Sequence, residues 1–127
     1  MFDAFRKVVN ADPTLSRLSR YYSVHFTLSI DQQSWHFDVQ DGALVSLSTE
    51  SDNLAAFVLT LDANSWEEFG KPTPTPGYHD ISAMIDQRHA RLSGDLFPWM
   101  ANMTFVKSII RHLRNHYETL CREGSLK

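Results

Sequence analysis

Residues 78–80 hold the side chains best suited to acid–base chemistry. Tyr78, His79 and Asp80 follow the proline-rich segment 71–77. A carboxylate can orient an imidazole and stabilise its charge, so that the imidazole transfers protons near neutral pH. Adjacent residues rarely face each other, however, and Asp80 is also placed to cap a helix that begins at residue 81. We expect the capping role, and His79 with Asp80 remains the acid–base pair of an alternative enzyme hypothesis.

Two other groups of reactive side chains lie near the C-terminal end. His112 and His116 are four residues apart, as two metal ligands on one helix face would be, but the glutamate of the HExxH motif and an evident third ligand are missing. We predict no metal site and expect both histidines to face solvent. Cys121 is the only cysteine, which excludes an intrachain disulfide, and its surroundings predict an inert thiol. Without a Gly-rich phosphate loop or a GxSxG elbow, the sequence predicts neither a catalytic residue nor a cofactor.

Composition excludes several classes of protein. The chain has 127 residues, 43% of them hydrophobic, which suffices for one domain with a buried core. The net charge of −3 disfavours nucleic-acid binding, which usually needs a clustered excess of Lys and Arg. No stretch approaches the roughly 20 apolar residues of a transmembrane helix. The first residues lack the pattern of a secretory signal, so we expect a cytoplasmic location.

Hydrophobic periodicity predicts an α+β fold. Residues 1–22 form an N-terminal helical segment, and period-two patterns then predict an antiparallel meander of three strands within 24–49. The dense apolar run 54–61 predicts a strand covered on both faces. The pattern also predicts a short helix capped by Asp62, another that follows Asp80, and a last strand near 91–93. We expect a single domain, 1–127, with a mostly antiparallel (mixed) sheet of about five strands covered by helices.

The strongest periodic signal predicts one long C-terminal helix over residues 96–121. Its apolar stripe alternates steps of three and four residues through Leu96, Trp99, Met103, Val106, Ile110, Leu113, Tyr117 and Leu120. Phe97, Met100, Phe105 and Ile109 lie off this stripe, so we expect the first half of the helix to be enclosed on more than one side. The methionines and aromatic residues here, with Met84, suit an adaptable ligand pocket, but ordinary core packing explains the same pattern.

Three segments resemble the sterol carrier protein type-two (SCP2) domain family. They are the strand pair FTLSIDQQSWHFDVQDGALVSLS with its Asp-Gly turn, the strand-to-helix step LTLDANSWEEFG, and RLSGDLFPWM, which is similar to the family's entry into its last helix. The likeness covers roughly residues 24–110. The chain departs from the family pattern at 70–90, where it inserts the Pro/Thr loop and the Tyr-His-Asp triplet.

The resemblance implies an internal apolar pocket between sheet and helices that receives a sterol, fatty acid, acyl-CoA or other lipid. Matching positions, together with Met84, imply a ligand-binding lining of Phe26, Leu28, Phe37, Val39, Phe57, Leu59, Trp66, Phe69, Met84, Trp99, Met100 and Met103. The 70–80 loop would form its rim. We therefore predict a lipid-binding module without a cofactor. A small enzyme using the residue 79–80 pair and an accessory module that binds a partner enzyme are the alternatives.

Overall fold

The computed structural model describes residues 2–18, 21–50 and 55–125. Its N-terminal helices and first strands are α1 (Asp3–Asn10), α2 (Pro13–Leu18), β1 (Val24–Ile30), β2 (Gln33–Gln40) and β3 (Ala43–Ser48). The chain continues through β4 (Phe57–Leu61), α3 (Ala63–Phe69), α4 (Ile81–Asp86) and β5 (Ala90–Gly94). It ends with α5 (Leu96–Ala101), α6 (Met103–Asn115) and α7 (Tyr117–Ser125).

The five strands form one mixed sheet in the order β3-β2-β1-β4-β5. β1 and β4 are parallel, and the other neighbouring pairs are antiparallel, which confirms the predicted sheet and its opening meander. The register places Phe26 opposite both Phe37 and Phe57. Apolar side chains of three strands therefore form continuous rows on one face, because side chains alternate between faces along a strand.

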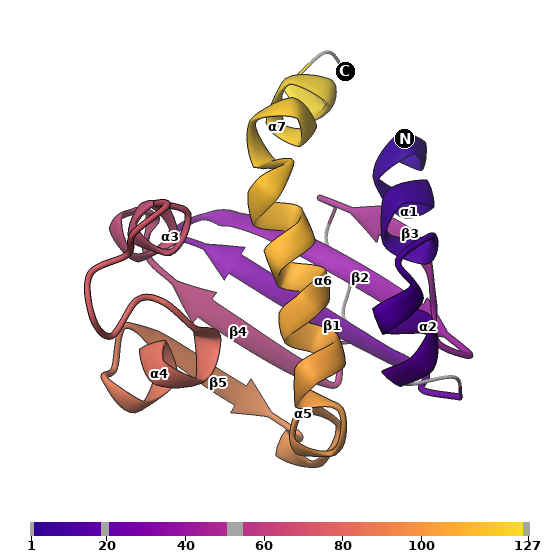
Figure 1. Ribbon diagram of the computed structural model, residues 1–127, viewed down its shortest axis with the longest axis horizontal. Coiled ribbons are helices and arrows are strands. Elements are labelled where there is room, and N and C mark those ends of the chain that lie inside the picture. The colour runs from indigo at the N-terminus through magenta and orange to yellow at the C-terminus, as the bar shows by residue number, and fades with distance from the viewer. Residues whose placement is uncertain (1, 19–20, 51–54, 126–127) are drawn as a thin grey trace.

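Helices cover that apolar face (Figure 1). In this view α6 crosses in front of the sheet, with α1 and α2 on one side of it and α4 on the other. On β4, Phe57 and Leu59 are fully buried, whereas Val58 is half-buried and Thr60 is exposed. The prediction that this strand is covered on both faces is thus wrong, because the helices that the structure describes lie over one face of the sheet (Figure 1). Residue 54, the start of the predicted run, lies outside the described residues.

Three aspartates begin the short helices, two of them, Asp62 and Asp80, as predicted. Asp62, Asp80 and Asp95 are the N-caps of α3, α4 and α5, and each carboxylate accepts a backbone N–H of the first turn, at 2.7, 3.1 and 3.1 Å. These bonds satisfy amide groups that have no partner within the helix. They fix where each helix begins and how its side chains are directed.

The single helix predicted for 96–121 is three helices in the structure. It is interrupted at Asn102, whose φ of −138° and ψ of 37° are not helical, and at His116. Asparagine side chains can compete for local backbone groups, and His116 Nδ1 lies 2.9 Å from the carbonyl oxygen of His112. α6, with 13 residues, is the longest helix, and within the described residues no helix has the length and apolar character needed to cross a bilayer.

The interruption at Asn102 changes which side chains are enclosed. Phe105 and Ile109 of α6 are 1% and 0% exposed, as the expected enclosure requires. Phe97 and Met100 of α5 are 75% and 67% exposed, so the prediction of enclosure is wrong for them. A separate six-residue helix can bury only one side against the sheet, and α5 buries Trp99.

Candidate functional site

The predicted lining residues come together between the sheet and α6, with one exception. Met100 is 67% exposed and points away from this layer, and Met103 is partly buried at its border. The remaining residues are at most 4% exposed: Phe26, Leu28, Phe37, Val39, Phe57, Leu59, Trp66, Phe69, Met84 and Trp99. The sequence therefore located an apolar layer built from three strands and three helices.

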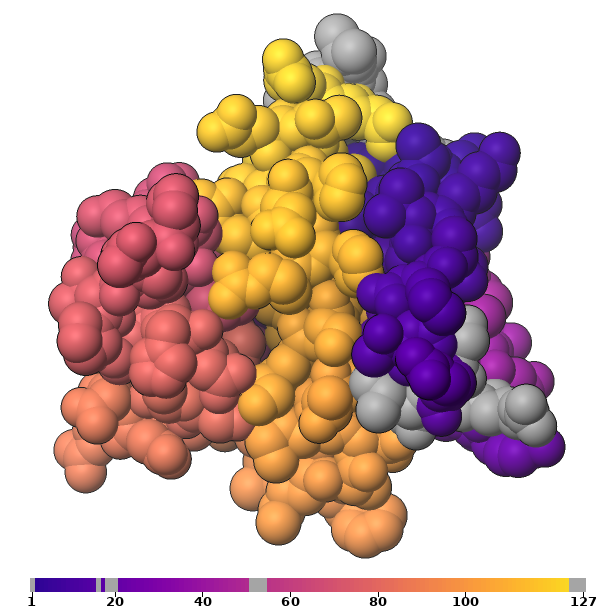
Figure 2. All heavy atoms as spheres, in the orientation of Figure 1, coloured from indigo at the N-terminus to yellow at the C-terminus, as the bar shows by residue number. Residues whose placement is uncertain are grey.

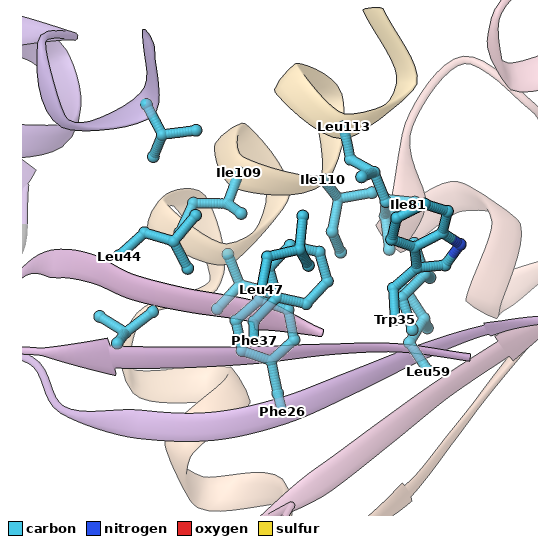
Figure 3. Packing of buried hydrophobic residues seen from close by; sticks show 14 of the residues in the cluster. Phe26, Trp35, Phe37, Leu44, Leu47, Leu59, Ile81, Ile109, Ile110 and Leu113 are labelled. Atoms are coloured by element: carbon cyan, nitrogen blue, oxygen red, sulfur yellow. The ribbon is translucent and has the colours of Figure 1, made fainter. Parts of the chain in front are cut away.

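Aromatic rings fill the centre of this layer. Phe26 stacks on Phe37 and on Phe57, with ring centroids 4.6 and 5.3 Å apart. Trp99 meets Phe57 edge-on at 6.0 Å. Figure 3 shows the side chains of β1 and β2 rising toward Ile109, Ile110 and Leu113 of α6. In this arrangement the side chains occupy the layer themselves, so a ligand would have to displace some of them.

A second aromatic group lies where α3 meets α7. Trp66 contacts Phe69 and Tyr117, with centroids 5.9 and 5.2 Å apart. Burial raises the pKa of Tyr117 to about 12. The Trp66 indole N–H is buried and finds no hydrogen-bond acceptor among the residues that the structure describes. A buried donor of this kind costs free energy, and an oxygen atom brought by a ligand or a water molecule would remove that cost.

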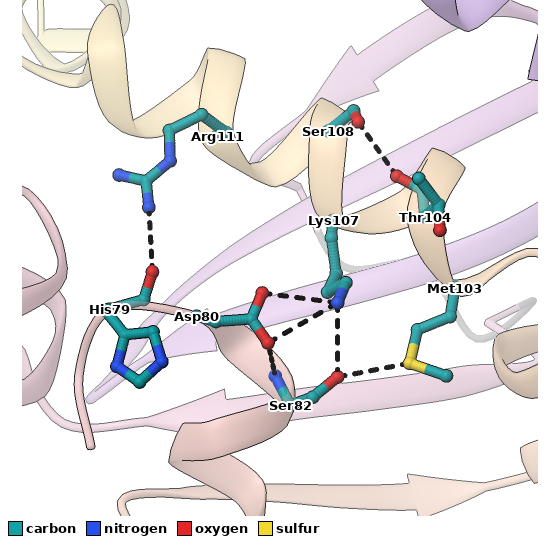
Figure 4. A network of polar contacts seen from close by, with 8 residues as sticks. All are labelled: His79, Asp80, Ser82, Met103, Thr104, Lys107, Ser108 and Arg111. Carbon is teal, nitrogen blue, oxygen red and sulfur yellow. Dashed lines mark hydrogen bonds and ion pairs between the residues drawn. The ribbon is translucent and has the colours of Figure 1, made fainter. Parts of the chain in front are cut away.

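Polar side chains join α4 to α6 beside the apolar layer. We refer to Asp80, Ser82, Met103 and Lys107 as the α4–α6 seam (Figure 4). Lys107 Nζ lies 3.2 Å from a carboxylate oxygen of Asp80 and donates to Ser82 Oγ at 3.4 Å. Ser82 Oγ in turn donates to the Met103 sulfur at 3.1 Å. These contacts connect a flexible methionine at the edge of the core to a charged pair near the surface.

Arg111 extends the polar border of the seam. Its guanidinium donates to the Phe69 carbonyl at 3.0 Å and to the His79 carbonyl at 3.4 Å. It also lies 3.7 Å from the centroid of the Phe69 ring, and burial lowers its pKa. Asp80, Lys107 and Arg111 line part of a polar depression of about 380 Å³, and Figure 2 shows the surface hollowed between α4 and α6.

Sequence reasoning missed the seam. Lys107 and Arg111 were not among the predicted site residues. Their spacing contained the signal: Met103, Lys107 and Arg111 follow one another at intervals of four residues, and side chains at that spacing share a helix face. The face therefore changes from apolar to basic along α6.

The alternative acid–base pair is not assembled. The side chain of Asp80 faces its own helix and Lys107, while His79 is exposed. The Tyr78 ring stacks on His89 instead, with centroids 4.1 Å apart and planes 17° apart. Asp80 therefore has the capping role that the sequence analysis preferred.

His112 of α6 and His116, which follows the end of α6, have structural contacts. His112 Nε2 lies 2.8 Å from a carboxylate oxygen of Asp12, which joins α2 to α6, and the ring of His116 packs edge-on against Phe5 at 6.0 Å. Both rings are half-buried, so the prediction that they face solvent is wrong. Within the described ranges, no three His, Cys, Asp or Glu residues are grouped closely enough to hold a metal ion.

An open groove of about 660 Å³ runs along β5. Leu61, Ile85, Leu92 and Leu96 give it apolar walls, and Arg88, Arg91 and His89 are among its polar residues. Leu92 pairs in register with Leu59 of the apolar layer. The groove thus approaches the same interior from the outer edge of the sheet.

Comparison with known proteins gives matches to solved structures only. No protein-family model and no curated protein matches the chain. A structure titled UbiJ-SCP2 ubiquinone synthesis protein matches with a TM-score of 0.57 and 11% identity, over 84% of this chain and 84% of that one. A stereoselective inverting sec-alkylsulfatase, Pisa1, from Pseudomonas sp. matches with a TM-score of 0.53 and 12% identity. That match covers 84% of this chain but only 16% of the sulfatase.

A double mutant of the same sulfatase matches with a TM-score of 0.51 and 13% identity, over 75% of this chain and 16% of that one. At these identities the likeness concerns the fold. The first match extends over most of both chains. The likeness therefore includes most of the five-stranded sheet and helices described above. The chain therefore has the SCP2-like fold that its sequence predicted.

Proposed function

We propose that this protein binds a lipid-like apolar small molecule between the sheet and α6. The observation that carries the proposal is the α4–α6 seam, which borders the buried apolar cluster through one partly exposed ion pair and hydrogen bonds among Lys107, Ser82 and Met103. Met84 and Met103 stand at this border, and methionine adapts readily to ligands of different shapes. The twelve predicted lining residues, apart from the exposed Met100, are the proposed walls.

Entry of a ligand would require α4 to move away from α6. The Asp80 and Lys107 side chains are 38% and 27% exposed, and an ion pair at such exposure contributes about 0–1 kcal/mol. Burying ten methylene groups would provide about 8 kcal/mol before the cost of association. The ion pair at the seam is thus a small contribution beside the apolar burial that a ligand would supply.

The unpartnered indole of Trp66 supports a ligand that carries an oxygen acceptor. Its N–H is the buried donor described above, at the end of the layer near Tyr117. A carbonyl or carboxylate oxygen could accept this bond, whereas a pure hydrocarbon could not. Fatty acids, sterols with a keto or hydroxyl group, and acyl thioesters all satisfy this requirement.

Native mass spectrometry of the freshly purified protein, followed by organic extraction, tests the proposal. We expect a stoichiometric apolar passenger, or a mass shift when a fatty acid, sterol or acyl-CoA is added. Met103→Asp should weaken this binding because it places a charge at the border of the apolar layer. Met100→Asp is the matched control, since the same substitution on an exposed side chain should leave binding in solution unchanged.

Circular dichroism and thermal unfolding of both variants show whether they remain folded. A clean apo mass with no shift for any of the three ligand classes would contradict the proposal. Equal binding by folded Met103→Asp and wild-type protein would contradict the location of the site.

A further inference from the structure

One short helix concentrates the exposed apolar side chains. Leu96, Phe97 and Met100 of α5 are 44%, 75% and 67% exposed, and we refer to them as the α5 patch. Other exposed large hydrophobic side chains come from separate segments, such as Val8 in α1 and Val45 in β3. Scattered apolar side chains are usual on protein surfaces, whereas a cluster indicates a contact surface.

The α5 patch is held in place by its own helix. Trp99 is 4% exposed and packs against Phe57, and the Tyr22 hydroxyl donates to the Pro98 carbonyl at 2.8 Å. Asp95 caps the first turn. Figure 2 shows α5 protruding at the lower edge of the molecule. The patch is therefore presented outward by an anchored helix, and its exposure does not come from a loose chain end.

Positive charge without a carboxylate partner lies beside the patch. Arg88 and Arg91 are exposed and line the β5 groove together with Leu96. Within residues 2–18, 21–50 and 55–125, neither arginine forms an ion pair. Asp31 and Asp62 also line the groove, but each accepts a backbone N–H of the segment that begins α3, at 3.2 and 2.7 Å. Arg88 and Arg91 are therefore exposed cations that form no ion pair with either carboxylate of the groove.

We propose that the α5 patch and these two arginines dock the protein on an anionic lipid bilayer. Phe97 and Met100 would enter the boundary between headgroups and acyl chains, and Arg88 and Arg91 would face the lipid phosphates. Unpaired arginines beside exposed apolar side chains match a surface that presents phosphate above hydrocarbon. With six residues, α5 lies on the bilayer and does not span it. This docking does not depend on the proposed interior ligand.

Flotation with lipid vesicles tests the proposal on the full chain. The vesicles are phosphatidylcholine alone, or phosphatidylcholine mixed with phosphatidylglycerol. We expect preferential binding to the anionic vesicles, reduced by added salt because salt screens the arginines. The double variant Phe97→Ser/Met100→Ser should lower vesicle partitioning at least about tenfold, since both side chains lose their apolar contact with lipid. Val8→Ser/Val45→Ser is the matched control and should bind like wild type.

Arg88→Gln/Arg91→Gln tests the charged part separately, and should remove most of the preference for anionic vesicles. Absence of vesicle binding, or equal binding by wild type and the Phe97→Ser/Met100→Ser variant, would overturn the proposal. The proposal would also be overturned if the Phe97→Ser/Met100→Ser variant bound vesicles like wild type but self-associated less in light scattering, because the patch would then be a protein–protein contact. Native mass spectrometry with a soluble fatty acid, without vesicles, reports the interior site independently and should be unchanged in this variant.

Discussion

The core under α6 and the α4–α6 seam are held together by opposite kinds of contact. Under α6, Phe26, Phe57 and Ile110 are 0–1% exposed and pack against other apolar side chains. At the seam, α4 meets α6 through an ion pair of partly exposed side chains and a bond to a methionine sulfur. Tight apolar packing resists change of volume, whereas partly exposed polar contacts contribute little.

This difference separates what keeps the protein folded from what could admit a ligand. Loss of a core side chain leaves a cavity that the surrounding rings cannot fill. Loss of a seam contact leaves groups that water can reach. α4 has six residues and buries two of them, Ile81 and Met84. We therefore expect it to open locally at a smaller cost than global unfolding, as short segments with few buried apolar contacts do. The predictions below test this comparison in order of expected effect.

The largest effect should come from Phe57→Ala. Its side chain is 0% exposed and touches Phe26 and Trp99, so truncation should lower the free energy of unfolding by about 3–5 kcal/mol. Urea unfolding followed by tryptophan fluorescence measures this change. Thr60→Ala is the control, because the side chain is exposed on the same strand and should change stability by less than about 0.5 kcal/mol. Comparable losses in the two variants would mean that the aromatic layer is not the stabilising region.

Much of this core could be predicted from the sequence because strand periodicity fixes which side chains share a face. Phe26 and Phe37 alternate with polar residues, and pairing brings them together on the covered face. The same reasoning failed on α5. Periodicity defines a helix face but not an interruption, and the non-helical backbone at Asn102 is what turns Phe97 and Met100 outward.

The seam could not be predicted in the same way. Asp80 and Lys107 are 27 residues apart in sequence and meet only because α4 and α6 pack beside the same sheet. A single sequence gives the capping role of Asp80, which depends on its near neighbours, but gives no tertiary partner. The sequence therefore predicted the apolar walls of the candidate site but not its polar border.

Two substitutions of Asp80 separate capping from ion pairing at the seam. Asp80→Asn keeps a good capping side chain and removes the charge opposite Lys107, whereas Asp80→Ala removes both and should cost about 1 kcal/mol more. In Asp80→Asn, we expect amide exchange in α4 to accelerate by up to about fivefold, the equivalent of about 1 kcal/mol. Exchange in β1 and β4 should stay unchanged. Hydrogen exchange measured by mass spectrometry resolves these segments, and equal acceleration in the strands would show that α4 does not open independently.

The smallest effect concerns the opposite side of α6, where Asp12 joins α2 to His112. The hydrogen bond with His112, and next the amide of Thr14, hold the pKa of the Asp12 carboxyl below its ordinary value of 3.8. A carboxyl whose pKa is depressed by folding stabilises the protein above its unfolded pKa, and this contribution is lost as pH falls through the folded pKa.

Asp12→Asn keeps an acceptor for the Thr14 amide but removes the charge. We expect wild type to have the higher urea midpoint at neutral pH, and the two midpoints to converge between about pH 5 and pH 2. In a His112→Ala background, Asp12→Asn should change the urea midpoint less, because the hydrogen bond between the two side chains is already absent. A constant difference between Asp12→Asn and wild type across this range would mean that the Asp12 charge contributes nothing to folding. The contact would then serve only to orient α2, and both sides of α6 would be held mainly by apolar packing.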